Sequence, residues 1–184
     1  MVTIRQVLKN IAKGQSGVRV KAIIAELEEI YKKIRDQITI THAMYEADGT
    51  TVYLKIPSQD KKIFYDIVLW FASKDRITLD TEFKIYSNSP FFTYNLAYVF
   101  NKLNSLLYPN YYKAIIIRQA PKVRNPLETT GFDKHVYSAL RFVAKQNLID
   151  LVKMFENKNE PDVAPFEEKV KETEYLKKKG ILYK

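Results

Sequence analysis

The spacing of hydrophobic positions predicts a helix near the start of the chain, followed by strands. Over residues 18–36 the apolar positions recur every three or four residues, with glutamate and lysine between them. Apolar and polar residues then alternate over 38–44, 52–56 and 79–86, as half-buried strands require. Asp48-Gly49 predicts a tight type I′ turn between the first two strands, because that turn needs positive φ angles.

The remaining strand signals complete a small sheet. The run 63–71 is apolar except for Asp66, which is typical of a strand covered on both faces. The short connections between these four strands predict an antiparallel meander. Residues 111–118, with three consecutive isoleucines, offer a fifth strand.

Two further segments predict long helices. Ser89 is a natural N-cap, Pro90 suits the first helical position, and residues 91–107 are apolar nearly all round. Such a helix must be buried on more than one side, by the sheet and by a neighbouring subunit. Asp133 caps a second long helix that ends near Asn157. We therefore predict an α+β fold, in which an antiparallel β-meander of four to five strands is flanked by an N-terminal helix and two long helices.

The chain divides into three parts. Residues 1–17 contain only basic charges and predict a basic N-terminal arm, residues 18–157 form the single α+β domain, and residues 158–184 predict a charged C-terminal tail or helix. Within the domain, the proline-containing segment 119–132 predicts an extended loop.

Composition excludes several kinds of chemistry. The chain has no cysteine, so disulfide scaffolds, cysteine zinc sites and thiol catalysis are excluded. We expect His42 on a half-buried sheet face and His135 in a solvated or capping role, and two histidines are too few for a metal cluster. No glycine-rich phosphate loop is present, and no apolar stretch is long enough to span a membrane. We therefore expect a protein that is not an enzyme and has no cofactor.

One group of residues offers an enzymatic alternative. Asp66 on one predicted strand, with Glu82 and Lys84 on the next, follows the order of magnesium-dependent nucleases of the PD-(D/E)xK type, in which such residues bind Mg²⁺ and position the attacking water. The simpler interpretation places Glu82 and Lys84 on the wet face of an edge strand, with Phe83 and Ile85 pointing inward.

Two regions of the chain, each made of two short segments, carry a resemblance to a known family. The segment Tyr86-Ser-Asn-Ser-Pro-Phe-Phe, followed by Tyr94-Asn-Leu-Ala-Tyr-Val-Phe-Asn101, and the later Pro121-Lys-Val-Arg-Asn-Pro126 with Gly131-Phe-Asp-Lys, resemble small structural proteins of the head–tail region of tailed bacteriophages. The resemblance implies a virion protein assembled in the host bacterial cytoplasm, in a ring-forming head–tail connector or tail-completion role. Its implied partners are further copies of itself, the portal and other connector or tail proteins. It implies no catalytic residue.

The loop that begins at Arg118 is the predicted assembly contact. Lys122 and Arg124 give it positive charge for an acidic partner surface. Phe132 at its end anchors in an apolar pocket of a neighbour or packs within its own domain. The net charge of +9 also favours nonspecific contact with packaged DNA, so a DNA-binding accessory protein is a further alternative.

Overall fold

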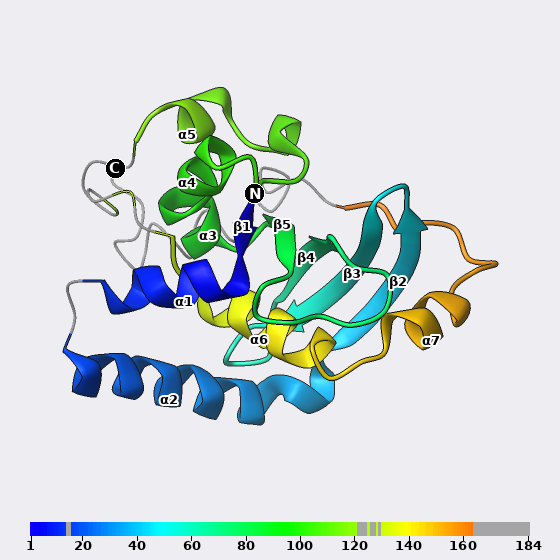
Figure 1. Ribbon diagram of the computed structural model, residues 1–184, viewed down its shortest axis with the longest axis horizontal. Coiled ribbons are helices and arrows are strands. Elements are labelled where there is room, and N and C mark those ends of the chain that lie inside the picture. Colours follow the sequence, from blue (N-terminus) through cyan, green and yellow to red (C-terminus); the bar gives the residue numbers. More distant parts are fainter. Residues whose placement is uncertain (14–15, 121–124, 126–127, 129, 164–184) are drawn as a thin grey trace.

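A five-stranded antiparallel sheet lies at the centre of the protein (Figure 1). The structure, a computed structural model, describes residues 1–13, 16–120, 125, 128 and 130–163. The strand order is β1-β5-β4-β3-β2, with bounds β1 Val2–Thr3, β2 Thr39–Glu46, β3 Gly49–Pro57, β4 Phe64–Phe71 and β5 Glu82–Ser87. Strands β2 to β5 follow one another as a meander, and all neighbouring pairs are antiparallel.

Helices surround this sheet and give the predicted α+β fold. Their bounds are α1 Ile4–Ala12, α2 Gly17–Ile34, α3 Pro90–Asn95, α4 Ala97–Lys102, α5 Ala114–Arg118, α6 Lys134–Val143 and α7 Leu148–Lys153, with 3₁₀ turns η1 Arg35–Gln37 and η2 Pro109–Tyr111. Helix α6 lies against β3 and β4, and α2 packs on the outside of α6 (Figure 1). Helix α7 lies beside the edge strand β2.

The predicted helix over 18–36 is confirmed as α2, which continues into η1. Ser16 caps its start by accepting a hydrogen bond from the Arg19 amide. Its stripe of large apolar residues is buried in the last turns, where Tyr31 and Ile34 are at most 3% exposed. On its flank, Glu28 accepts hydrogen bonds from Tyr137 and from Arg141 of α6. Apolar packing and this polar contact together fix α2 on α6.

The predicted strand over 63–71 is confirmed as β4, which is buried on both faces apart from its first residue. On β5, Phe83 and Ile85 point into the core and are fully buried, while Glu82 and Lys84 are half-buried. This face assignment is therefore confirmed. The Lys84 ammonium lies 5.3 Å from the centre of the Trp70 ring, so it shields part of that aromatic side chain from water.

The prediction of a separate basic arm over residues 1–17 is wrong. Val2 and Thr3 pair with Phe83 and Glu82 as strand β1, so β5 is not an edge strand. The Val2 amide donates to Ser105 Oγ at 2.8 Å, and Val7 of α1 is fully buried in the core. The N-terminal residues join the domain because β5 offers an unpaired edge that a short strand can complete.

The fifth strand is therefore β1, and the prediction of a strand over 111–118 is wrong. This segment forms the end of η2 and helix α5. The edge of β5 that such a strand would need is occupied by β1 and, further along, by Ser105 and Leu107, which exchange backbone hydrogen bonds with Ile85. Because this edge of β5 is occupied, the isoleucine run forms a short helix beside α4.

The hairpin between β2 and β3 is present but its predicted type I′ turn is wrong. Its loop is Ala47-Asp48, since Glu46 already pairs with Gly49, and neither loop residue has a positive φ angle. Glycine is needed at position 49 for a different reason. A Cβ atom there would collide with the backbone oxygen of Phe71 on β4, so only glycine allows this close approach of the strands.

Each predicted long helix is broken into two short ones. Between α3 and α4 the backbone oxygen of Asn95 accepts a hydrogen bond from the Asn125 side chain at 2.9 Å, which interrupts the helical pattern. Between α6 and α7 the Asn147 side chain accepts from the amides of Ile149 and Asp150 and so begins a new helix. In both places a side chain forms a hydrogen bond with a backbone group that would otherwise continue the helix, and the helix is interrupted there.

One further predicted boundary, the start of β5, is wrong, and the predicted C-terminal tail falls mostly outside the described residues. Strand β5 begins at Glu82 instead of residue 79, because Thr78 and Thr81 close a turn through a 2.9 Å bond from the Thr78 amide to Thr81 Oγ1. Of the predicted tail over 158–184, residues 164–184 lie outside the described residues. Val163, the last described residue, packs against the core.

Candidate functional site

Asp66, the first residue of the alternative nuclease site, forms hydrogen bonds that hold neighbouring segments of the fold together. Its side chain is 12% exposed and accepts hydrogen bonds from Lys55 Nζ at 2.8 Å and from the Asn88 side chain at 3.0 Å. The Asp66 amide donates back to the Asn88 side-chain oxygen at 2.9 Å. Asp66 and Asn88 thereby join β4 to the segment that leads into α3.

The other two nuclease residues lie far from Asp66. Lys84 pairs with Trp70, and the backbone oxygen of Glu82 accepts from the amide of Ala72. At about 3.3 Å per residue these partners lie about 13 Å and about 20 Å along the strand from Asp66. Within the described residues no cluster of three acids or histidines is placed to hold a metal ion. The structure does not bring Asp66, Glu82 and Lys84 together.

We therefore expect no DNA cleavage by the purified protein in the presence of Mg²⁺. The double variant Asp66→Asn with Glu82→Gln is expected to behave like the wild type in the same gel assay, because the two carboxylates lie too far apart to share a metal ion. A nuclease of known activity serves as the positive control. Cleavage by wild type that needs Mg²⁺ and disappears in the double variant would contradict this.

Both histidines are buried, more deeply than the half-buried sheet face expected for His42 and in contrast to the solvated or capping role expected for His135. His42 is 4% exposed, and its ring makes edge contacts with those of Tyr53 and Phe155. His135 is 5% exposed and its ring centre lies 4.4 Å from that of Tyr65. The expectation that His135 is solvated or acts as a cap is wrong, because its helical turn faces the sheet.

A buried polar cluster joins the start of α3 to the start of α6. Asp133 Oδ1 accepts from the amides of His135 at 2.6 Å and Val136 at 2.9 Å, which caps α6. Its other oxygen accepts from the hydroxyl of Ser89, which itself caps α3. Burial by itself raises the pKa of Asp133, but the His135 side chain, whose Nδ1 lies 3.4 Å from Asp133 Oδ1, together with the hydrogen bonds from the Ser89 hydroxyl and the Val136 amide, outweighs it and holds the pKa below its ordinary value.

The cluster contains serine, histidine and aspartate but lacks the geometry of a catalytic triad. The Ser89 hydroxyl donates directly to Asp133, so no imidazole stands between them to take its proton. Ser89 is fully buried, and substrate has no access to it. We interpret the cluster as a structural link between two helix starts. The two caps were visible in the sequence, whereas nothing in it indicated that they contact each other.

The predicted assembly residues fall in three different situations. Arg118 is the last residue of α5 and is exposed. Phe132 packs within its own domain, with its ring 6.1 Å from that of Tyr137, so this residue follows the second of its two predicted options. Lys122 and Arg124 lie outside the described residues.

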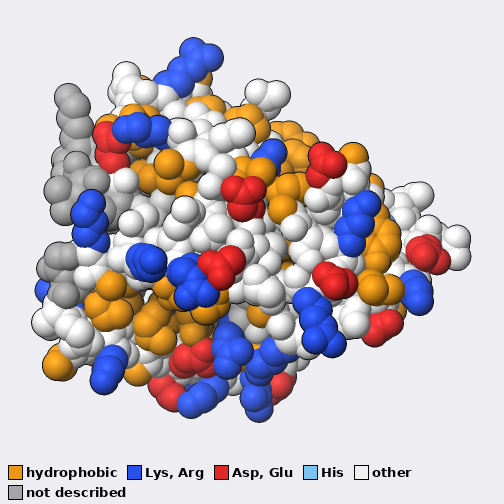
Figure 2. Space-filling model, in the orientation of Figure 1, with side chains coloured by type: hydrophobic (Ala, Val, Ile, Leu, Met, Phe, Trp, Pro, Cys, Tyr) orange, Lys and Arg blue, Asp and Glu red, His pale blue; other side chains and the backbone are white. Residues whose placement is uncertain are grey.

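Exposed apolar side chains gather on the helices α3 and α5 and just after α4. Ile115 of α5 is 61% exposed, Phe91 of α3 is 53% exposed and Leu103, just after α4, is 39% exposed. Helices α4 and α5 contact each other, and the Asn101 side chain donates to the backbone oxygen of Ile117. We call α3, α4 and α5 the helical cap, which lies in the upper part of Figures 1 and 2. Packing of α5 covers part of α4, while these three side chains remain uncovered.

No helix in the described part of the chain is both long and apolar enough to cross a membrane. No family model matches the chain, and no match to it is found among curated proteins or solved structures.

Proposed function

We propose that the protein is a non-enzymatic structural component of a tailed-phage particle, which forms a closed homo-oligomeric ring as a head–tail connector or tail-completion protein. Its partners are further copies of itself, the portal and neighbouring connector or tail proteins. Its surplus of lysine and arginine suits nonspecific contact with packaged DNA. The sequence resemblance to phage head–tail proteins suggested this role.

The observation that carries the proposal is the exposed apolar surface of the helical cap. Large apolar side chains that stay in water on adjacent helices are typical of protein–protein contact surfaces. Phe91 and Ile115 are each more than half exposed, whereas nearby Phe92 and Phe100 are fully buried. The cap therefore has apolar surface beyond what its own core needs. Lys122 and Arg124, which follow Arg118 closely in the sequence, would supply charge for the same contact.

The double variant Lys122→Glu with Arg124→Glu tests this role. It is expected to leave the isolated fold intact, because lysine and arginine are rarely buried without a partner and substitutions of solvent-facing charges usually change stability by less than about 0.5 kcal/mol. It is expected to reduce the yield of infectious particles when it complements a phage lacking the wild-type gene, since like charges across an interface are costly.

The matched control reverses two exposed lysines elsewhere, Lys61→Glu with Lys62→Glu, in the loop between β3 and β4. Circular dichroism checks the folding of both variants. Normal titres from the folded Lys122/Arg124 variant would show that this segment makes no charge-dependent contact. Normal titres without any copy of the gene would overturn the structural role itself.

A further inference from the structure

The two ends of the molecule carry opposite charge. Residues 1–25 contain five basic and no acidic residues, and Arg19 and Lys21 are exposed on the first turns of α2. At the far end of the long axis lie the β2–β3 hairpin and α7 (Figure 1). There residues 44–50 and 148–163 contain six acidic residues against two basic ones. We call residues 16–21 the basic end, and residues 44–48 with 150–162 the acidic end.

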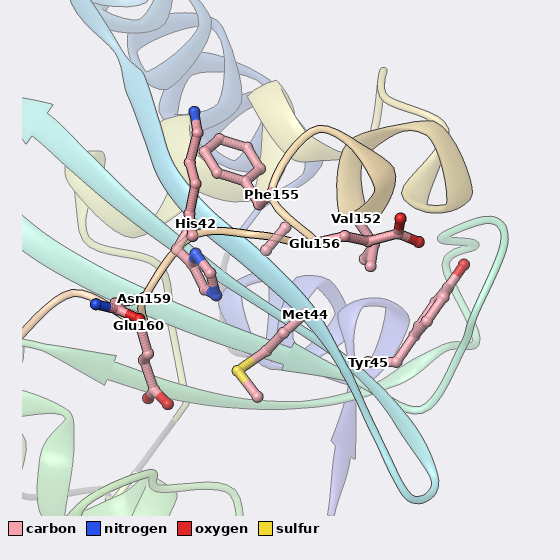
Figure 3. Close-up of a pocket in the computed structure, with 10 residues that line it drawn as sticks. His42, Met44, Tyr45, Val152, Phe155, Glu156, Asn159 and Glu160 are labelled. Carbon is pink, nitrogen blue, oxygen red and sulfur yellow. The ribbon is translucent and has the colours of Figure 1, made fainter.

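The acidic end contains a hollow beside the edge strand β2. Its volume is about 410 Å³, and Figure 3 shows the side chains around it. One part of the wall is apolar and another carries carboxylates, with lining residues that include Met44, Val152, Phe155, Glu156 and Glu160. Such a wall suits a long side chain that has an apolar stem and a positive end.

Polar atoms around the hollow have capacity for a further partner. Nδ1 of His42 is buried and has no hydrogen-bond partner among the described residues, and the ring lies between Phe155 and Met44 at the hollow (Figure 3). Glu160 accepts one hydrogen bond, from the Tyr53 hydroxyl, and a carboxylate can accept several. The one lysine in the lining, Lys158, lies 4.6 Å from the centre of the Phe155 ring.

The basic end has the complementary properties. Val18 is 80% exposed, although it is apolar, and it stands beside Arg19 at the start of α2. Neither Arg19 nor Lys21 forms an ion pair within the described part of the chain. The start of an 18-residue helix also carries a partial positive charge from its free amides, which adds to these two cations.

We propose that the basic end of one copy docks on the acidic end of the next, with the Arg19 side chain in the hollow beside β2. The Arg19 stem would lie on Met44 and Val152, and its guanidinium would donate to Glu156 and Glu160. Unlike ends on one molecule give a head-to-tail contact, which closes into a ring when the rotation per copy permits. This inference rests on the proposed ring-forming function and names the contact that builds the ring.

Cross-linking of the full-length protein tests the contact. Because the chain has no cysteine, a pair placed at Val18→Cys and Asn159→Cys is the only reactive pair in the molecule. A short bismaleimide is expected to give a ladder of dimers, trimers and larger species on a denaturing gel. The matched control pairs Val18→Cys with Asn110→Cys, an exposed residue outside the acidic end. A ladder no stronger than that of the control overturns the proposal.

Charge reversal gives a second readout in solution. By sedimentation velocity, Arg19→Glu with Lys21→Glu is expected to weaken self-association roughly tenfold or more. Lys32→Glu with Lys33→Glu, the same charge change at the other end of α2, is expected to have little effect. Mixing the Arg19/Lys21 variant with a Glu156→Gln, Glu160→Gln variant is expected to give one-to-one dimers, since each retains one working end and the two altered ends do not attract each other.

The remaining outcomes separate this contact from the proposed function. A wild type that stays monomeric at its solubility limit overturns the head-to-tail contact. So does an Arg19/Lys21 variant that loses only DNA binding, which would make the basic end a DNA surface. In either case a phage that still needs the gene to form particles would leave the structural function standing.

Discussion

Replacing Phe83 with alanine is expected to lower the free energy of unfolding by about 3–5 kcal/mol. Phe83 is fully buried on β5 and pairs with Phe71 of β4 on one side and with Val2 of β1 on the other. Its ring centre lies 6.1 Å from that of Phe100 in α4. Truncation therefore leaves a cavity at the point where three strands and the helical cap meet.

Urea unfolding followed by circular dichroism measures this loss. Leu79→Ala is the matched control, because Leu79 is 46% exposed and its backbone oxygen, which accepts from the Arg5 amide, is retained. The control is expected to change stability by less than about 0.5 kcal/mol. If the unfolding midpoint of Phe83→Ala equals that of wild type, the inward face of β5 has been assigned wrongly.

Replacing Asp133 with alanine is expected to cost about 2–4 kcal/mol, the second large effect. The substitution removes the acceptor for two amides of α6 and for the Ser89 hydroxyl, all of which stay buried. Loss of the cap on the two amides costs about 1 kcal/mol, and the buried Ser89 hydroxyl left without an acceptor costs about 1–3 kcal/mol. Asn147→Ala is the matched control, since Asn147 caps α7 in the same way at an exposed position. Equal losses in the two variants would show that burial of the Asp133 cluster adds nothing.

The pH dependence of Asp133 gives an independent check. Despite the effect of burial, its bonds hold its pKa below the ordinary value, so the carboxylate stabilises the folded state. That contribution is complete above the unfolded-state pKa of about 4 and is lost as the pH falls through the lower folded-state pKa. The stability difference between wild type and Asp133→Asn is therefore expected to be constant from neutral pH to about 4 and to shrink below it. A difference that already shrinks near neutral pH would assign the titration to another group.

Local patterns in the sequence were sufficient to predict most of the sheet and the helix α2. Alternation over β2, β3 and β5 and the apolar run of β4 depend only on which residues face water, so the α+β meander followed from them. The helix caps Ser89 and Asp133 were predictable for the same reason, because a cap acts within a few residues of itself.

The candidate nuclease site shows where such patterns fail. Strand order alone placed Asp66 near Glu82 and Lys84, but the distance between them depends on the register of β4 and β5. Register is set by how the turns and the two buried faces fit together, so it has no signal within either strand. The hollow beside β2 was also invisible, since its walls come from β2, α7 and the residues after α7.

The sequence by itself determined the elements whose causes are local, namely the strands, the amphipathic helix, the caps and the basic charge that precedes Glu26. The tertiary structure alone decided which segment completed the sheet. Two residues at the N-terminus pair with β5 and three consecutive isoleucines become helical, because a sheet edge can be filled only once. It also decided that the basic and acidic ends lie at opposite ends of the long axis, since that separation is a property of packing and not of any one segment.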